Sequence, residues 1–310
     1  MKCLVTGSAG FIASKVVIRL KELGHEIIGY DIVADQDLLN LKDVEEAVKG
    51  ADVVYHIAAQ ADLTKMQEID AARDGVLRNV EATHNVAYAC AKYKKWLIFA
   101  STVCVYGNVD SHPENEDKTL PNPSELYACS KYAAEWLIRG YAKNFDMPYT
   151  ILRFATIYGE GMREAMGMHI FFRQALQGHT ITVHGDGKQD RTLTYIDDLV
   201  DGIVAVLDHP EAKGHVINLT ATEAVSAIKM AHDVASATGN ACQIDFTPQR
   251  PNQTFHEDFD TSKAHELLGW KAKTPWLEGV KKTHVWMKTQ MKTLDTTKIT
   301  GQGNDFVSPK

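Results

Sequence analysis

The sequence has few cysteines, and their distribution does not match the sites that cysteines most often build. The five cysteines are odd in number and widely spread over 310 residues, which indicates reduced thiols rather than a disulfide framework. None of the 13 histidines belongs to an HExxH pattern or pairs with a cysteine at metal-ligand spacing. We therefore predict no metal site and a cytoplasmic location.

Long hydrophobic runs and an excess of positive charge are also missing. No apolar run approaches the ~18 residues of a membrane span, so we expect no membrane partner. The formal net charge is −7 and no basic cluster is present, which argues against nucleic acid as a partner. The first predicted strand begins at residue 2, and we therefore expect no signal peptide.

Strands and helices alternate through the first half of the chain. Short apolar runs predict strands, and a period of about 3.6 residues predicts helices. The strands are 2–6, 26–31, 52–58, 96–101 and 149–154, and the helices lie near 11–23, 42–49, 73–92 and 127–144. This alternation predicts an α/β fold, a doubly wound parallel sheet (Rossmann-like) with helices on both faces.

A glycine turn joins the first predicted strand to the first helix, and its spacing is typical of dinucleotide binding. Gly7 allows a sharp turn, and Gly10 allows the backbone to approach a pyrophosphate at the positive end of the helix. Asp31 follows the second strand, where a carboxylate can bind the ribose hydroxyls. The alternative is an ordinary strand–turn–helix without a ligand.

A second group of residues has the spacing of a proton-transfer site. Tyr127 and Lys131 lie one turn apart on a predicted helix, so the ammonium can lie beside the phenol. A nearby cation lowers the pKa of tyrosine, which is otherwise about 10. Thr102 ends a predicted strand at the ligand-binding edge of the sheet and can bind the same substrate hydroxyl. The alternative is a hydroxyl-rich turn and a surface Tyr–Lys pair.

With these motifs in place, the sequence resembles the extended short-chain dehydrogenase/reductase family, in its nucleotide-sugar epimerase/dehydratase branch. The resemblance covers roughly residues 1 to 288, and its motifs occur in the order found in the family. Beyond those above, they are His56-Ile57-Ala58-Ala59, Asn79, Ser101–Gly107, Leu152–Gly159, Gly185–Arg191, Leu193–Asp198 and Leu267-Leu268-Gly269-Trp270.

The resemblance implies a set of cofactor-binding residues. In the family pattern, the pyrophosphate is cradled by Gly7, Gly10, Phe11 and Ile12, the ribose is held by Asp31, the adenine is bordered by Asp37 and Leu38, and the remaining contacts come from Ala58, Ala59, Tyr127 and Lys131. Asp31, with no Arg or Lys from 30 to 41, favours NAD over NADP because a carboxylate repels a 2′-phosphate.

The chain divides into three predicted parts. Residues 1–155 form an NAD-binding Rossmann-like domain. Residues 156–290, where the pattern loosens, form a smaller mixed α/β substrate-binding part that is interleaved with the first and includes a strand at 215–220 and a helix near 224–238. Residues 291–310 have little apolar patterning and are predicted to be a flexible tail.

The resemblance also implies substrate contacts. Arg191 matches the arginine that clamps the substrate diphosphate in the family, and Arg250 is a second candidate clamp. For each, a surface ion pair is the alternative. Thr156 takes the place of an asparagine that often contacts the substrate, so that contact is in doubt.

Two positions after Thr102 bear on the type of reaction. Dehydratases and decarboxylases of the family carry carboxylates there, whereas this chain has Val103 and Cys104, which disfavours both reactions. Cys104 has two interpretations, a small buried thiol or an acid/base thiol that faces the sugar. A 3,5-epimerase relative also uses a lysine near residues 161–167, where this chain has none.

The resulting hypothesis is an NAD-dependent nucleotide-sugar 4-epimerase. Tyr127, assisted by Thr102 and Lys131, would remove the proton of the C4 hydroxyl during transient oxidation, and hydride would return to the opposite face. Two alternatives stay open: an NAD-dependent oxidoreductase of the same family, acting as a keto-sugar reductase or an alcohol dehydrogenase, and a non-catalytic NAD-binding protein. The resemblance further implies a homodimer formed by the helices near 76–92 and 127–144.

Overall fold

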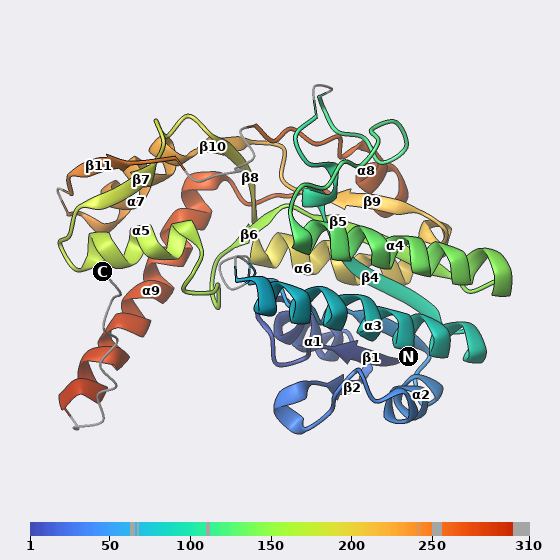
Figure 1. Cartoon of the computed structure of the whole chain (residues 1–310). Helices are drawn as coiled ribbons and strands as arrows, with labels where there is room; N and C mark the ends of the chain where they lie inside the picture. Colours follow the sequence, from blue (N-terminus) through green and yellow to red (C-terminus); the bar gives the residue numbers. More distant parts are fainter. Residues whose placement is uncertain (63–65, 67, 110–111, 241, 250–255, 300–310) are drawn as a thin grey trace.

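The computed structural model describes residues 1–62, 66, 68–109, 112–240, 242–249 and 256–299. Within these residues the largest sheet is parallel, with six strands in the order β2-β1-β3-β4-β5-β9 (Figure 1). The strands are β1 (Lys2–Thr6), β2 (Glu26–Tyr30), β3 (Val53–His56), β4 (Trp96–Thr102), β5 (Tyr149–Phe154) and β9 (Val216–Leu219). The strand order reverses between β1 and β3, so a ligand site is expected at their carboxyl ends.

Helices cover both faces of this sheet, which confirms the predicted doubly wound architecture. One face is covered by α1 (Phe11–Glu22) and α6 (Ile196–Ala205), and the other by α2 (Leu41–Lys49), α3 (Ile69–Tyr93) and α4 (Leu126–Phe145). Along β1, Val5 belongs to the same apolar cluster as Val16 of α1, whereas Leu4 belongs to the cluster of Val44 on the other face. Strands buried on both faces are apolar at successive positions, as this sequence shows.

The helix that follows β1 begins and ends where its sequence dictates. Gly10 is the N-cap of α1 and has an extended backbone. Ala13, Val16 and Leu20 recur at helical spacing and are buried against the sheet. Arg19 and Lys21 lie in the last turn, where positive charge complements the helix dipole. The amino end of α1 is thereby fixed at the carboxyl end of β1.

The second part of the chain contains two small sheets. In one, β6 (Thr156–Tyr158), β8 (Asp190–Tyr195) and β10 (Ala224–Ser226) lie in the order β10-β8-β6, and in the other β7 (Ile181–His184) pairs with β11 (Ile244–Thr247). They pack with α5 (Gly167–Leu176), α7 (Ala227–Thr238) and α9 (Trp276–Ile299), whereas α8 (Ser262–Leu268) packs against β9 of the large sheet.

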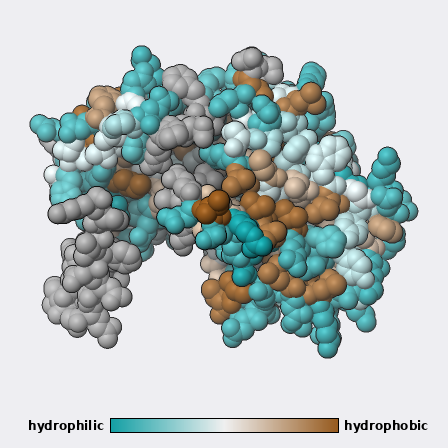
Figure 2. Space-filling model, in the orientation of Figure 1, coloured by the Kyte–Doolittle hydropathy of each residue, from teal (hydrophilic) through white to brown (hydrophobic). Residues whose placement is uncertain are grey.

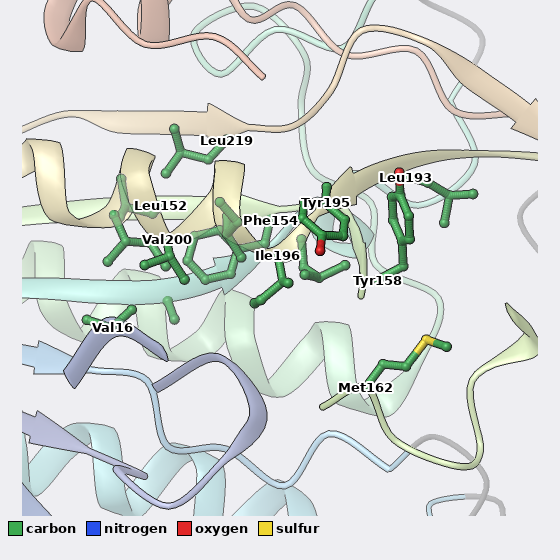
Figure 3. Close-up of a cluster of buried hydrophobic side chains, with 14 of the residues drawn as sticks. Val16, Leu152, Phe154, Tyr158, Met162, Leu193, Tyr195, Ile196, Val200 and Leu219 are labelled. Carbon is green, nitrogen blue, oxygen red and sulfur yellow. The ribbon is translucent and has the colours of Figure 1, made fainter. Parts of the chain in front are cut away.

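One hydrophobic cluster continues from the large sheet into this second part (Figure 3). Phe154 of β5 and Ile196 of α6 belong to it, together with Tyr158 of β6 and Tyr195 of β8. The rings of Tyr158 and Tyr195 lie 5.5 Å apart in an edge-to-face arrangement. The shared core fixes the position of β6 and β8 relative to the carboxyl ends of the large sheet.

Three elements differ from the sequence-based expectation. The strand predicted at 215–220 is β9, which pairs with β5 in the large sheet rather than lying in the second part. Residues 224–226, predicted to start a helix, form β10, because three residues are too few for a periodic signal. Helix α9 continues to Ile299, into the predicted tail; the rest of that tail, 300–310, lies outside the described residues.

Among the described residues, no helix combines the length and the apolar character that crossing a membrane requires. The same part of the chain contains no group of three or more histidine, cysteine, aspartate or glutamate residues arranged to hold a metal ion.

Candidate functional site

The turn between β1 and α1 has a backbone that only glycine can supply. Gly7 has φ +69°, and a Cβ atom on it would lie 2.8 Å from the Cα of Ala58. A Cβ atom on Gly10 would lie 3.0 Å from the carbonyl oxygen of Gly7, which also accepts a 2.8 Å hydrogen bond from the Gly10 N–H. A side chain at either position would therefore fill or distort the turn.

This turn fits a pyrophosphate. Gly10 offers no side chain to cap α1, and the N–H groups of Phe11 and Ile12 lie in the first turn, where a helix leaves its donors without intrahelical partners. These donors and the positive end of the helix dipole favour an anion at this point.

Asp31 lies beside the same turn. Its carboxylate accepts hydrogen bonds from the Ala9 N–H at 2.9 Å and the Val33 N–H at 3.1 Å. Two hydrogen bonds fix the loop that follows. The Tyr30 hydroxyl donates to the backbone carbonyl oxygen of Asp37 at 3.1 Å, and the Asn85 side-chain amide donates to that of Leu38 at 2.9 Å. The structure thus brings Asp31 next to the glycine turn and holds Asp37 and Leu38 in one loop near it.

A buried hydrogen-bond network supports the loop that contains Ala58 and Ala59. The Thr6 hydroxyl lies 2.8 Å from Nδ1 of His56 and accepts hydrogen bonds from the N–H groups of Ile57 and Ala58 at 3.2 and 3.3 Å. Burial, together with the positive charge of Lys131, lowers the pKa of His56 to about 3. The imidazole is therefore neutral and serves to position this loop against Gly7.

Asn79 connects the cofactor side of the site to α4. Its side chain accepts a 2.7 Å hydrogen bond from the Gln60 N–H and donates to the Ser130 hydroxyl at 3.0 Å. The Ser130 hydroxyl in turn donates to the Tyr127 carbonyl oxygen at 2.7 Å. This chain of bonds ties the loop after β3 to the first turn of α4, the turn that carries Tyr127.

Lys131 is buried where α4 packs against β4. Only 2% of the residue is exposed, and its Nζ lies 4.0 Å from the centroid of the Phe99 ring. Burial lowers the pKa of Lys131 to about 7, and the negative charge of Glu135 opposes the shift. The side chain is therefore poised between its two protonation states near neutral pH.

The electrostatics of Tyr127 differ from the expectation. Burial raises its pKa above the usual value of about 10, Cys104 adds to the rise, and Arg163 opposes it. The sequence analysis predicted a lowered pKa for Tyr127, and the protein residues alone do not produce it. Thr102 ends β4 as expected, and its hydroxyl accepts a 3.2 Å hydrogen bond from the Cys104 N–H.

Beneath this site lies a fully buried ion pair. Glu135, one turn after Lys131 on α4, accepts hydrogen bonds from Nε and Nη2 of Arg153 at 3.0 and 2.7 Å and from the Ser101 hydroxyl at 2.6 Å. The Arg153 guanidinium also lies 4.7 Å from the centroid of the Tyr106 ring. These contacts fix α4 against the carboxyl ends of β4 and β5.

Of the three candidate substrate residues, the structure describes Arg191 and Thr156 but not Arg250. Arg191 is the second residue of β8, and its Nε lies 3.4 Å from a carboxylate oxygen of Glu257. Its charge acts on the pKa of Cys104 and of Glu125, which places it near the Thr102 turn and the start of α4. Thr156 begins β6, opposite Leu193 of β8. Arg250 lies outside the described residues.

Sequence reasoning missed three charged residues in this region. Glu125 and Glu257 act on the pKa of Cys104, and Arg163 acts on that of Tyr127. Positions 103 and 104 carry no carboxylate, but the fold brings carboxylates from elsewhere in the chain close enough to act on the pKa of Cys104. Nothing in their local sequence signals this, because the contacts arise from segments far apart in the chain.

A surface pocket lies between β8, β10 and the loop before α9. Its lining contains none of the residues predicted to bind cofactor or substrate. It is formed by Leu193, Ala221–Glu223, Val225 and Ala272–Trp276.

Comparisons with known proteins agree with the geometry. The model of the NAD dependent epimerase/dehydratase family matches residues 3–220. An uncharacterised UDP-glucose epimerase of Bacillus subtilis is 30% identical, covering 90% of this chain and 96% of its own. A UDP-N-acetyl-alpha-D-glucosaminuronate decarboxylase of Bacillus cytotoxicus is also 30% identical, covering 93% and 98%. A crystal structure of UDP-glucuronic acid 4-epimerase from Bacillus cereus, in complex with UDP-glucuronic acid and NAD, has a TM-score of 0.87 at 30% identity, covering 94% of this chain and 100% of its own.

Proposed function

This chain belongs to the NAD dependent epimerase/dehydratase family, and we propose that it is a nucleotide-sugar 4-epimerase. Members of this family are NAD-dependent enzymes, which confirms the prediction that the cofactor is NAD. The observation that supports the proposal is that Thr102 and the glycine turn lie at the carboxyl ends of two parallel strands of one sheet, β4 and β1, and that the Tyr127–Lys131 turn packs against β4. The 4-epimerases among the relatives support it.

NAD, when bound, supplies a hydride acceptor that can return the hydride to either face of a planar keto group. The protein residues would do the rest. Tyr127 exchanges a proton with the sugar hydroxyl, and Thr102 orients that hydroxyl through its own hydroxyl group. Lys131, whose pKa of about 7 lets it change charge near neutral pH, would help to hold the cofactor and, when protonated, would favour the phenolate of Tyr127 one turn away.

Arg191 is the proposed ligand of the substrate diphosphate, because a guanidinium offers paired donors to phosphate oxygens. The candidate substrates are therefore sugars linked to a nucleoside diphosphate, and several of the matched relatives are named for UDP-sugars. Arg250 stays a candidate second ligand of the diphosphate, and Thr156 stays a candidate substrate contact.

The choice between epimerase and decarboxylase rests on the environment of Cys104. The residues next to Thr102 are apolar or a thiol, and burial raises the pKa of the Cys104 thiol to about 11. Neither residue supplies a carboxylate for acid/base work. Glu125 and Glu257 are the nearest carboxylates in electrostatic terms, so uronic acid substrates belong in the test.

The test is incubation of the purified protein and NAD with UDP-, GDP- and dTDP-sugars, including a UDP-uronic acid, followed by product analysis. We expect inversion at C4 without net change in NADH. Stoichiometric NADH formation or consumption would instead indicate an oxidoreductase, and release of carbon dioxide a decarboxylase. Tyr127→Phe should abolish turnover and retain NAD binding; a protein that binds NAD and leaves the whole panel unchanged would contradict the proposal.

We also propose a homodimer formed through α3 and α4, in a cytoplasmic protein. Apolar side chains gather over these helices in Figure 2. The exposed ones are Ile69, Leu77, Leu126, Trp136 and Phe145. An apolar surface shared by two adjacent helices suits burial against a second copy. All five cysteines of the chain are free thiols in the structure, in keeping with a reducing compartment.

A further inference from the structure

Arg191, the proposed diphosphate ligand, already has an internal anionic partner. Its Nε lies 3.4 Å from Oε1 of Glu257, and the two side chains are 23% and 9% exposed. The second oxygen, Oε2, accepts a 3.0 Å hydrogen bond from the Thr192 N–H. An incoming phosphate group and Glu257 therefore compete for one guanidinium.

The backbone of Glu257 is fixed to β8, so the competition cannot be relieved by moving the whole residue away. Its N–H donates to a carboxylate oxygen of Asp190 at 2.9 Å, and its carbonyl oxygen accepts a bond from the Thr192 hydroxyl at 3.3 Å. Its carboxyl group must then stay near the guanidinium when the substrate arrives.

The surroundings of Glu257 favour protonation of its carboxylate. Burial raises its pKa to about 7, Arg191 lowers it, and Asp190 and Glu114 raise it. The charged and titratable groups around it come from β8, from η3 (Val103–Tyr106), from the segment after η3 and from the segment before α8. They are Asp190, Arg191, Cys104, His112, Glu114, His256 and Asp258.

Two histidines in this group have carboxylate partners of their own. His256 Nδ1 lies 2.7 Å from Asp190, and His112 Nδ1 lies 3.0 Å from Glu114. The bond to Asp190 raises the pKa of His256, so an experiment must separate the protonation of His256 from that of Glu257.

We propose that Glu257 is a specificity-determining residue that couples binding of the substrate diphosphate to the uptake of one proton. On binding, the phosphate oxygens take over the Arg191 guanidinium, and the Glu257 carboxylate accepts a proton from solvent. No other bond forms or breaks. This inference rests on the proposed function, since it requires a diphosphate at Arg191.

The sign follows from electrostatics. A carboxylate that loses a neighbouring cation and gains a neighbouring anion holds a proton more tightly. A ligand that raises a pKa binds more tightly at low pH, and its affinity falls by up to about tenfold per pH unit above the free-state pKa. The site should therefore bind nucleotide sugars more weakly as the pH rises from about 7 to about 8.

The proton can be counted by isothermal titration calorimetry. UDP-glucose is titrated into NAD-saturated Tyr127→Phe protein, in which turnover is blocked, in two buffers of different ionisation enthalpy. The two phosphate groups of UDP-glucose do not titrate near neutral pH, so any proton taken up belongs to the protein. We expect uptake of about half a proton at pH 7, approaching one at pH 8, with affinity falling about fivefold between them.

Glu257→Gln in the same background should abolish the proton uptake and make the affinity independent of pH. Gln keeps an oxygen for the Thr192 N–H and has nearly the same shape. The matched control is Glu266→Gln, at an exposed carboxylate of α8, which should behave as the parent. Circular dichroism and NAD binding establish that both variants are folded.

Each outcome supports the inference or overturns it. Proton uptake that persists in Glu257→Gln would assign the effect to another group, such as His256 or Lys131, and overturn it. Binding of UDP-glucose by the parent with the same affinity at both pH values would also overturn it, even if the glutamine variant did not fold, while leaving the proposed function intact. Absence of UDP-glucose binding together with an unchanged sugar panel would overturn both.

Discussion

The buried ion pair between Glu135 and Arg153 allows a sharp test of how the site is supported. The perturbation is Glu135→Gln, which removes one charge and keeps the shape of the side chain. Glu135 is 0% and Arg153 is 1% exposed, so the guanidinium would be left in the interior without its carboxylate. Breaking a buried pair in this way costs about 3–5 kcal/mol.

The cost translates into a melting temperature. At about 2.1 cal/mol/K per residue, the 310 residues of the chain give an unfolding entropy of about 0.65 kcal/mol/K. A loss of 3–5 kcal/mol should therefore lower the melting temperature by about 5–8 °C. Thermal unfolding followed by circular dichroism measures this shift, and Glu266→Gln should change it by less than about 1 °C.

Removing both charges gives a different expectation. In Glu135→Leu with Arg153→Leu, neither member of the pair is left buried without the other, and replacement of an ion pair by apolar residues is often neutral in stability. The double variant should therefore recover most of the lost stability. A melting temperature for Glu135→Gln within about 1 °C of the parent, or a double variant less stable than the single one, would refute the reasoning.

Two further predictions concern the cofactor side of the site. Gly7→Ala should weaken NADH binding at least about tenfold in a fluorescence titration, because the new Cβ would lie 2.8 Å from the Ala58 backbone and the residue has φ +69°. The matched control is Gly24→Ala, where φ is +82° but no atom lies within 4 Å of the new Cβ. This control should lower stability and leave NADH binding unchanged. Lys131→Met should raise the melting temperature most below pH 7 and progressively less toward pH 10. The reason is that burial lowers the folded-state pKa of Lys131 to about 7, so the parent pays for a buried charge at low pH and not above its unfolded pKa of about 10.4; an equal gain at all pH values would contradict this.

The parts of the site that were predicted from the sequence are those whose chemistry lies within a few consecutive residues. The turn containing Gly7 and Gly10, the strand that ends at Thr102, and the pair on α4 are each local patterns with a physical cause. Their common position then follows from one rule, that parallel strands of a doubly wound sheet present their carboxyl ends together. The structure places each of these segments where that rule puts it.

The parts that were not predicted depend on contacts between distant segments. The strand β9 returns to the large sheet beside β5 after an excursion through the second part, and an apolar tetrapeptide does not encode its partner. The same holds for Glu257, whose bonds to Asp190 and Thr192 span more than 60 residues of sequence. The effect of burial on the pKa of Tyr127 was not predicted for a related reason, since burial is a property of the fold.

This division has a consequence for the reaction. The local motifs determine that a hydride-accepting cofactor and a proton-transferring tyrosine can meet, and every reaction of the family needs both. The outcome of the reaction depends on which acids and bases face the sugar, and we propose that in this chain they include Cys104 and the carboxylates of Glu125 and Glu257, which act on its pKa. These three residues would then determine the product, because the motif residues are compatible with all of the alternatives. Substitutions at these three positions should change which sugar is accepted or which product forms, whereas substitutions at Tyr127 should only remove activity.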